Sequence, residues 1–265
     1  MTFLRLQHSS DESLRVEIIR TSMKMNTLGI NQGKSGNVSA RISTSSPGQG
    51  ETTTGVAPDR DGGRIVEPAS QLTSLYDEAP QRQDAFAFLI TPTGIPYEHT
   101  KPTQIVAMRM DGTHDGDILP SSEWRFHRDI YLARPDVNAI VHTHAAFATT
   151  LACLDRDIPP FHYMIAAAGG KDIRCAPYAT FGTQELSDYA VAALQDRKAC
   201  LLSHHGMIAC GVNLEKALAL AVEVETLARM YWQALQIGEP ALLSDKEMGT
   251  VLEKFLTYGR QPISS

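Results

Sequence analysis

The sequence predicts a three-layer α/β/α fold whose central sheet is mixed and largely antiparallel. Segments with the apolar periodicity of helices alternate with short apolar segments typical of strands. Several of these strands follow one another without an intervening helix, which a purely parallel sheet does not allow because parallel neighbours need long crossovers. At 265 residues and 43% hydrophobic content, the chain suits one large α/β domain or two small ones.

The composition narrows the class of protein. A net charge of −6, with no run of Lys or Arg, disfavours nucleic acid as a partner. The four cysteines are scattered and form no C-x-x-C pair, which is typical of free thiols in a reducing compartment. The N-terminus lacks an apolar stretch long enough for a signal peptide, and no apolar run reaches about 18 residues. We therefore expect a cytoplasmic protein with no membrane partner.

The first expected element is a helix over residues 9–28. Ser9, followed three residues later by Glu12, fits a capping box at its start, and Gly29 ends it. A Gly- and Asn-rich loop comes next, followed by a short alternating strand at 38–42.

Residues 43–84 differ in composition from the rest of the chain. Ser, Thr, Pro, Gly, Gln and charged residues dominate there, and such a segment cannot bury enough apolar surface to order itself. We interpret it as a low-complexity surface insertion. A strand at 85–90 follows. If it pairs as a hairpin with the strand at 38–42, the insertion lies at the opposite end of that hairpin from Gly36 and Thr93.

The middle of the chain carries the residues of greatest chemical interest. A strand at 105–110 precedes a helix that runs to about Arg134, for which Ser122 is a good N-cap. Glu123 then lies in the first turn of the helix, where exposed N–H groups favour carboxylates and bound anions. The next strand, at 139–144, is apolar and ends in His142 and His144.

The rest of the chain continues the alternation of helices and strands. Helices are expected at about 145–154, 183–195, 214–236 and 245–256, with Thr183 and Asn213 as N-caps. Strands are expected at 173–178 and at 200–210, the latter as a strand pair or a kinked strand around Gly206. Since adjacent strand residues point to opposite faces, only one of His204 and His205 can join a common site.

His142 and His144 lie two residues apart in a strand, so their imidazoles point to the same side of the sheet. An H-x-H pair alone is more often a chance pair than a metal site. Here, however, one of His204 and His205 can supply a third ligand and Glu123 a fourth, which completes a catalytic zinc site. A carboxylate that binds the metal in the resting state can also act as an acid/base once substrate binds.

A second cluster suits one phosphate monoester. It offers hydroxyls, an amide and backbone N–H groups, and its members are Asn37, Thr93, Gly94, Ser121 and Ser122. Because a metal can polarise a carbonyl and stabilise an enolate, the two clusters together indicate chemistry on a small phosphorylated sugar. His127, one helical turn after Glu123, is interpreted as a residue that supports or packs behind the site rather than as a metal ligand.

Five stretches of the chain closely resemble the class II aldolase/adducin family. They are Gly36-Asn37-Val38-Ser39, residues 89–98 (LITPTGIPYE), residues 120–127 (PSSEWRFH), residues 141–144 (VHTH) and residues 204–206 (HHG). The resemblance covers about residues 9–42 and 86–260. It implies a single family domain over residues 1–265 that carries the insertion at 43–84, and a cyclic homotetramer with its sites at subunit interfaces.

The resemblance also implies roles for individual residues. One Zn²⁺ per subunit would be held by Glu123, His142, His144 and His205, and Glu123 would double as the catalytic acid/base. The phosphate of the substrate would bind to Gly36, Asn37, Thr93, Gly94, Ser121 and Ser122. Tyr163 would reach the site of a neighbouring subunit, and Tyr258 would help to close over the aldehyde. The implied reaction is reversible cleavage of L-fuculose 1-phosphate, or a close sugar phosphate, to dihydroxyacetone phosphate and L-lactaldehyde.

Two alternatives stay open. The chain could be another sugar-phosphate enzyme of this family, such as a pentulose-phosphate 4-epimerase or a methylthioribulose-phosphate dehydratase. It could also be a non-catalytic interaction module like the adducin head, which need not keep metal ligands, whereas here all four candidates are present. Glu123 and the sequence around Tyr163 favour the aldolase.

Overall fold

The computed structural model describes residues 2–42 and 87–257, with side chains from residue 11 onward. Within these residues, seven strands form one sheet in the order β3-β2-β1-β4-β7-β6-β5. The strands are β1 (Asn37–Arg41), β2 (Phe88–Ile90), β3 (Val106–Met108), β4 (Ala139–Thr143), β5 (Cys175–Ala176), β6 (Ala199–Leu202) and β7 (Gly206–Gly211). β5 pairs with β6 in parallel, and the other neighbouring pairs are antiparallel. The predicted mixed, largely antiparallel sheet is confirmed.

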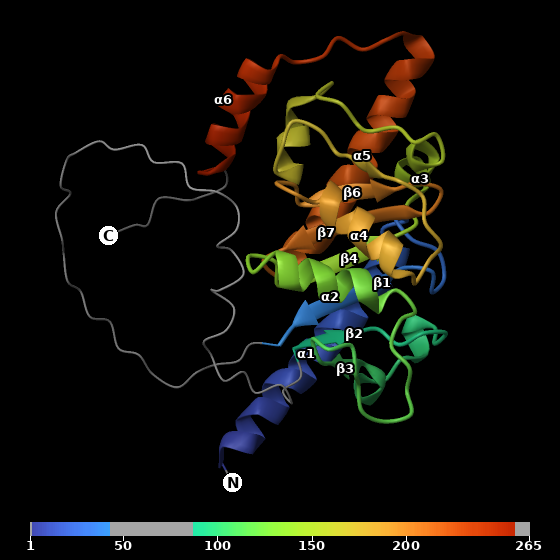
Figure 1. Cartoon of the computed structure of the whole chain (residues 1–265), viewed down its shortest axis with the longest axis vertical. Coiled ribbons are helices and arrows are strands. Elements are labelled where there is room, and N and C mark those ends of the chain that lie inside the picture. Colours follow the sequence, from blue (N-terminus) through green and yellow to red (C-terminus); the bar gives the residue numbers. More distant parts are fainter. Residues whose placement is uncertain (1, 43–86, 258–265) are drawn as a thin grey trace, which may run out of the picture. The chain divides into compact units, whose positions relative to one another are not determined.

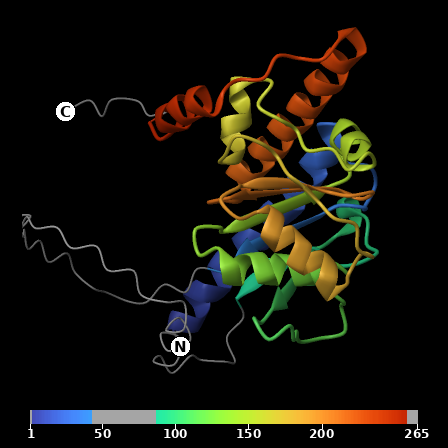
Figure 2. The same ribbon diagram turned by 45° about the horizontal axis from the view of Figure 1, so that its top comes forward.

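Helices cover both faces of this sheet, as Figures 1 and 2 show. The α-helices are α1 (Thr2–Thr27), α2 (Trp124–Ala133), α3 (Ala146–Ala152), α4 (Gln184–Ala193), α5 (Leu214–Ile237) and α6 (Asp245–Phe255), and the short 3₁₀ helices are η1 (Tyr97–His99), η2 (Pro102–Gln104) and η3 (Tyr163–Ala168). This arrangement confirms the predicted three-layer α/β/α fold.

The alternation of apolar residues along the strands divides the core into two layers. Val141 of β4 packs in the layer that includes α1 and α5, whereas its neighbour Ile140 packs in the layer that includes α2 and α4. Both side chains are fully buried. Each such residue contributes about 1.5–3 kcal/mol relative to an exposed one, so β4 is held firmly at the centre of the sheet.

Helix α1 begins earlier than the sequence suggests. It extends back to Thr2, and Ser9 lies inside it, so the predicted capping box at Ser9 and Glu12 is wrong. No Gly or Pro occurs between Thr2 and Ser9. The residues before Ser9 therefore contain no helix breaker, and the helix continues through the position of the predicted cap.

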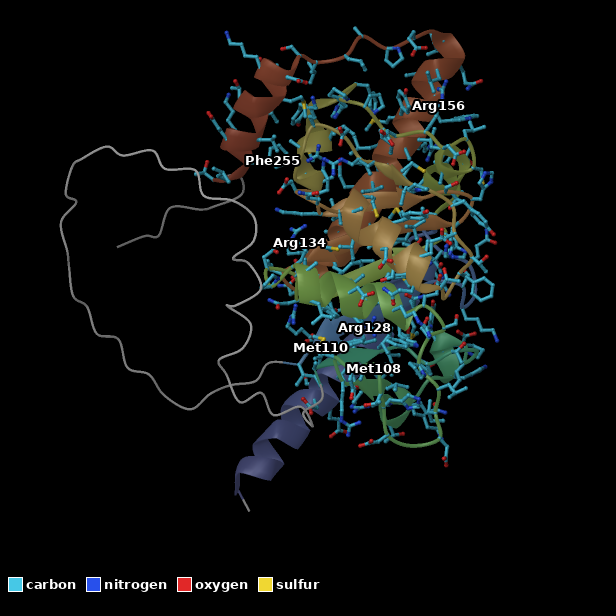
Figure 3. All side chains as sticks on the ribbon, in the orientation of Figure 1. Met108, Met110, Arg128, Arg134, Arg156 and Phe255 are labelled. Carbon is cyan, nitrogen blue, oxygen red and sulfur yellow. The ribbon has the colours of Figure 1, made fainter. Side chains whose placement is uncertain are left out.

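Helix α2 also begins differently from the prediction, because Glu123 rather than Ser122 is its N-cap residue. The Glu123 side chain caps no N–H of the helix, which leaves its carboxylate free to turn towards the sheet. At the other end, Arg134, labelled in Figure 3, donates hydrogen bonds to the carbonyl oxygens of Leu194 (2.9 Å) and Arg197 (2.7 Å). These bonds join the end of α2 to the end of α4.

The later helices begin where the sequence predicts. The Thr183 side chain accepts a hydrogen bond from Leu186 N–H at the start of α4, and the Asn213 side chain accepts one from Lys216 N–H at the start of α5. Both predicted N-caps are confirmed. Each contributes about 1 kcal/mol by pairing an otherwise unsatisfied N–H group.

β1 and β2 pair antiparallel, as the hairpin assumed from the sequence requires. Ser39 pairs with Ile90 and Arg41 with Phe88, so the Asn37 end of β1 lies beside the chain that leaves β2 towards Thr93. The predicted insertion at 43–84 lies outside the described residues, and the assignment of a single domain over 1–265 stays a prediction.

Residues 200–210 form a strand pair, β6 and β7, joined by a turn at 203–205. His204 and His205 therefore both lie in the turn, and His204 has a φ of +53°. We expected only one of the two histidines to join a common site because adjacent strand residues point to opposite faces. That argument does not apply, since neither residue belongs to a strand.

Candidate metal centre and active site

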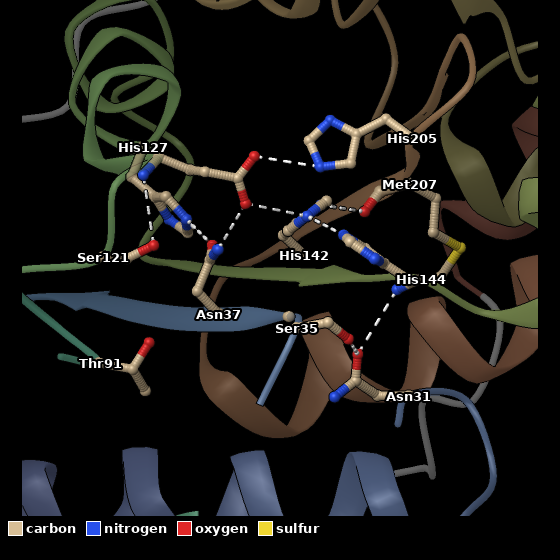
Figure 4. Close-up of polar contacts among 12 residues, drawn as sticks. Asn31, Ser35, Asn37, Thr91, Ser121, His127, His142, His144, His205 and Met207 are labelled. Atoms are coloured by element: carbon tan, nitrogen blue, oxygen red, sulfur yellow. Dashed lines mark hydrogen bonds and ion pairs between the residues drawn. The ribbon is translucent and has the colours of Figure 1, made fainter. Parts of the chain in front are cut away.

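β4 places the first two histidines of the site. All five residues of this strand are buried, His142 is in the strand, and His144 follows directly after its end. The ring centroids lie 5.0 Å apart and the two Nε2 atoms 3.1 Å apart. Figure 4 shows the two rings turned towards one another. The structure thus brings together the two side chains that the strand period predicts on one side.

His205 reaches the same point from the turn between β6 and β7. Its ring centroid lies 4.8 Å from that of His142 and 4.9 Å from that of His144. Gly206 permits this approach, because a Cβ there would lie 2.6 Å from the carbonyl oxygen of Thr143. A larger residue would push the turn, and His205 with it, away from β4. His204 is exposed and its ring faces that of Tyr178 instead.

Glu123 completes the cluster from the start of α2. Its Oε2 lies 3.1 Å from Nε2 of His142, and its Oε1 lies 3.1 Å from Nε2 of His205. One ligand atom from each of Glu123, His142, His144 and His205 lies within 4.8 Å of the others. Burial alone would raise the pKa of the Glu123 carboxyl, but the nearby imidazoles of His142 and His205 hold that pKa well below its usual value.

The donor set fits a divalent cation. Nδ1 of His142 lies 3.0 Å from the carbonyl oxygen of Met207, which can only accept, so Nδ1 carries the proton and the lone pair of Nε2 faces the cluster. The buried Oε1 of Glu123 has no polar neighbour among the described residues that pairs with it other than Nε2 of His205, 3.1 Å away, and a cation between these two atoms would bind both. Three imidazoles and one carboxylate are the ligands that catalytic zinc sites use.

The protonation of His144 also fits a metal ligand. Burial, followed by the nearby charges of His142 and His205, lowers the pKa of His144 from 6.5 to about 4. The imidazole is therefore neutral near pH 7, which is the form that binds metal.

The predicted phosphate residues converge on one corner beside this cluster. Val38 N–H donates to Oγ1 of Thr91 (3.2 Å) at the end of β2, and Ser121 N–H donates to the carbonyl oxygen of Thr91 (3.0 Å). Thr93 N–H donates to the carbonyl oxygen of Leu119 (3.1 Å). These bonds bring the three loops that carry the candidate residues together: Gly36 and Asn37, Thr93 and Gly94, and Ser121 and Ser122.

This corner is more open than the metal cluster. Thr93, Gly94 and Ser122 are exposed, whereas Gly36 and Ser121 are buried. Gly94 has a φ of +74°, a conformation that side chains rarely adopt. The sequence reasoning missed Lys34, whose Nζ donates to the carbonyl oxygen of Gly94 (2.6 Å) and adds a positive charge at this corner.

The two predicted tyrosines lie apart from the cluster of their own chain or outside the described residues. Tyr163 begins η3, is half exposed, and lines a cavity of about 570 Å³ with residues that include Phe161, Glu247 and Phe255. Tyr258 lies outside the described residues. Their predicted roles therefore stay predictions.

The sequence reasoning also missed how much buried structure stands behind Glu123. Asn37 donates from Nδ2 to Oε2 of Glu123 (2.8 Å), and the other end of its amide bonds to His127, which is fully buried. Asn37 therefore joins the metal cluster to the phosphate corner. The interpretation of His127 as a residue behind the site agrees with this position. Ser39 and Tyr131 extend this row of buried polar side chains. Their spacing could have indicated it: Ser39 lies two residues after Asn37 on β1, and Tyr131 lies four residues after His127 on α2.

Comparison with known proteins identifies the family. Residues 16–232 match the family model described as "Class II Aldolase and Adducin N-terminal domain". The chain belongs to the class II aldolase/adducin family. The recognition made from its motifs is confirmed.

Several members of this family are similar over nearly the whole chain. An L-fuculose phosphate aldolase of Escherichia coli K12 is 49% identical over 92% of this chain and 94% of its own length. A 5-methylthioribulose-1-phosphate/5-deoxyribulose-1-phosphate aldolase of Rhodospirillum rubrum is 47% identical over 93% of each chain. A solved structure of an L-fuculose 1-phosphate aldolase superposes with a TM-score of 0.74 at 35% identity, over 92% of this chain and 96% of the other.

These relatives and the metal cluster together establish the reaction class. The chain is a class II aldolase, a metal-dependent lyase of carbohydrate metabolism. Among the residues that the structure describes, no helix has the length and apolar character needed to cross a membrane.

Proposed function

We propose that this enzyme reversibly cleaves a ketose 1-phosphate between carbons 3 and 4 to dihydroxyacetone phosphate and an aldehyde. The first candidate substrate is L-fuculose 1-phosphate, which yields L-lactaldehyde. One Zn²⁺ per chain would be held by Glu123, His142, His144 and His205. The observation that supports this proposal most is the position of the metal cluster beside the corner formed by the three phosphate loops.

Zinc bound at the cluster would supply Lewis-acid stabilisation of the negative charge that develops next to the ketose carbonyl. In the cleavage direction, the bond between carbons 3 and 4 breaks, the hydroxyl on carbon 4 loses its proton, and carbon 3 gains one. Glu123 would deliver the proton to carbon 3; the position of its carboxylate within the metal cluster supports this role. In the condensation direction, a tyrosine hydroxyl, from Tyr163 or Tyr258, would donate its proton to the aldehyde oxygen that becomes the hydroxyl on carbon 4; in cleavage, the tyrosinate would take that proton back.

The phosphate would bind at the corner of Gly36, Asn37, Thr93, Gly94, Ser121 and Ser122. Three of these residues are exposed, so a hydrated phosphate can enter without crossing the core. The Asn37 amide already bonds to Glu123 and His127. Binding of phosphate at this corner would therefore set the distance from the phosphate to the proton-transferring carboxylate.

The second candidate substrate is 5-methylthioribulose 1-phosphate or 5-deoxyribulose 1-phosphate. The Rhodospirillum rubrum relative named for these substrates is almost as similar as the fuculose-phosphate relative, at 47% against 49% identity. All of these sugars share the first three carbons and the phosphate, and they differ in the aldehyde that leaves. The metal cluster and the phosphate corner therefore serve any of them.

We also propose a cytoplasmic homotetramer in which Tyr163 acts in the site of a neighbouring subunit. Two observations support this placement: half of Tyr163 is exposed, and it lines a cavity with residues that directly precede η3 and with residues of α6, rather than the cluster of its own chain.

The test is a substrate panel on zinc-loaded enzyme, with dihydroxyacetone phosphate release as the readout. The panel contains L-fuculose 1-phosphate, 5-methylthioribulose 1-phosphate, 5-deoxyribulose 1-phosphate and ribulose 5-phosphate. We expect release from L-fuculose 1-phosphate with the highest kcat/KM. A higher value for either deoxypentulose phosphate would support the second candidate. Turnover of ribulose 5-phosphate with no release of dihydroxyacetone phosphate from any sugar would contradict the proposal in favour of epimerisation.

A further inference from the structure

Behind Glu123, polar side chains from α2 and β1 form one continuous hydrogen-bonded line. Glu123, the N-cap residue of α2, is followed at intervals of four residues by His127 and Tyr131, so the three side chains lie on one side of the helix. Asn37 and Ser39 lie two residues apart and share one face of β1. The two sets interleave in the order Glu123, Asn37, His127, Ser39, Tyr131. We call the last four residues the donor chain.

Every link of the donor chain is short and buried. Asn37 Nδ2 lies 2.8 Å from Oε2 of Glu123, and Asn37 Oδ1 contacts Nε2 of His127. Oγ of Ser39 lies 2.7 Å from Nδ1 of His127 and 2.7 Å from the hydroxyl oxygen of Tyr131. The exposed fraction of these four side chains is 3% or less, so water does not compete for the bonds.

The chemistry of the acceptors gives the line one direction. The carboxylate oxygen of Glu123 only accepts, so the Asn37 amide turns its N–H₂ towards Glu123 and its carbonyl oxygen towards His127. That carbonyl oxygen also only accepts, so Nε2 of His127 carries the proton and Nδ1 is the acceptor. Ser39 therefore donates to Nδ1 and accepts from Tyr131. Burial raises the pKa of the Tyr131 hydroxyl above its usual value, which keeps it a donor.

This direction distinguishes the two oxygens of Glu123. Oε2 receives the last donor of the chain, whereas Oε1 receives no donor from that chain and instead faces Nε2 of His205, 3.1 Å away, in the metal cluster. We propose that His127 and Ser39 are positioning residues for the aldol reaction: they hold the Asn37 amide with its N–H on Oε2, so that the proton of substrate carbon 3 is transferred through Oε1. This inference rests on the proposed function, because it assigns residues to the proton transfer by Glu123.

The experiment isolates that proton transfer. Zinc-loaded enzyme is incubated with dihydroxyacetone phosphate in D₂O, and NMR follows the loss of one hydroxymethyl proton, alongside kcat and KM for cleavage. His127→Phe removes the N–H donor to Asn37, and we expect exchange and kcat to fall by roughly 10–100-fold while KM changes by less than about twofold. His127→Gln keeps an N–H in reach of Asn37, and its exchange should recover to within about fivefold of wild type.

Ser39→Ala is a second, smaller change, which removes only the hydroxyl that donates to His127. The exchange rate of this variant should fall by roughly 3–10-fold. Ser22→Ala is its matched control. Ser22 is equally buried, and its hydroxyl donates to the carbonyl oxygen of Ile18 within α1. Loss of this hydroxyl removes no hydrogen bond of the donor chain, so it should not change the position of Glu123. If His127→Phe does not fold, the same measurements on Ser39→Ala and His127→Gln test the inference.

Three outcomes would overturn the inference. Exchange in the folded lesion variants could stay within about twofold of wild type. Exchange could instead fall in proportion to the amount of zinc lost and return when zinc is added. The role of the donor chain would then be to retain the metal, and not to position Glu123. Ser22→Ala could lower exchange as much as Ser39→Ala. If wild-type enzyme neither exchanges the proton nor releases dihydroxyacetone phosphate, the proposed function itself fails, and this inference fails with it.

Discussion

The metal cluster and the phosphate corner lie side by side but are built in different ways. The cluster consists of side chains fixed by a central strand, a helix start and a tight turn, and Glu123 and His142 are buried. The phosphate corner consists of loop ends held by backbone hydrogen bonds, and half of its candidate residues are exposed. We infer from this difference that the two halves have separate tasks: the buried half would fix charge and proton positions, and the open half would admit and release a hydrated anion.

If this division is correct, Glu123→Gln should affect turnover and not phosphate binding. Loss of the carboxylate removes the group that moves the proton, so kcat should fall by roughly 10²–10⁴-fold. The inhibition constant of inorganic phosphate should stay within about threefold, because the glutamine keeps the shape of the side chain. Glu98→Gln, the same change on an exposed residue of η1, is the control and should leave both unchanged. Equal loss of turnover and phosphate binding in Glu123→Gln would remove the distinction between the two halves.

Thr93→Ala should show the opposite pattern. Its hydroxyl lies on an exposed loop of the phosphate corner, and one hydrogen bond to a charged group contributes about 1.5 kcal/mol, which corresponds to about tenfold in KM. We expect kcat to stay within about twofold, as measured by steady-state release of dihydroxyacetone phosphate. A fall in kcat with KM unchanged would place Thr93 in the chemistry rather than in phosphate binding.

The buried half should also make the fold sensitive to acid. Burial, followed by the charge of His142, lowers the pKa of His127 from 6.5 to about 3. Because the unfolded chain binds this proton more readily, the free energy of unfolding falls as the pH drops from about 6.5 towards 3. The loss between pH 7 and pH 5 is about 2 kcal/mol from this residue. In urea titrations of His127→Gln, the free energy of unfolding should fall by about 2 kcal/mol less between pH 7 and pH 5 than in the wild type. An unchanged pH dependence in this variant would contradict the lowered pKa of His127.

The smallest effect is expected from deletion of residues 46–83. In the sequence, this segment falls between Arg41 of β1 and Phe88 of β2, and these two paired residues lie at the end of the hairpin opposite the one that carries Asn37. The kcat/KM for cleavage should stay within about twofold. A larger fall in a deletion protein that keeps its metal and its oligomeric state would show that the insertion contributes to the site.

Much of this division could be predicted from local sequence patterns. The spacing of His142 and His144 in an apolar strand was sufficient to place both imidazoles together. The order of the segments around residues 43–84 made a β1–β2 hairpin a reasonable assumption, from which the position of the insertion relative to Gly36 and Thr93 follows. Such features depend on strand period and connectivity, which the sequence carries directly.

Features that depend on how elements meet could not be predicted in this way. Capping patterns favoured Ser122, but the structure puts Glu123 at the N-cap, where its carboxylate turns to the histidines. Strand alternation gave no valid basis for choosing His205, because both histidines of that pair lie in a turn. The interleaving of α2 with β1 depends on the register between a helix and a strand, which no local pattern encodes.

The most direct test of the account is a metal titration of chelator-treated enzyme. Zinc is added in known amounts, and the rate of dihydroxyacetone phosphate release from the best substrate of the panel is measured. The account predicts that the rate rises linearly and reaches its plateau at one zinc per chain, and that His142→Ala shows neither tight zinc binding nor activity. Full activity in the metal-free wild type, or in His142→Ala without bound metal, would contradict it.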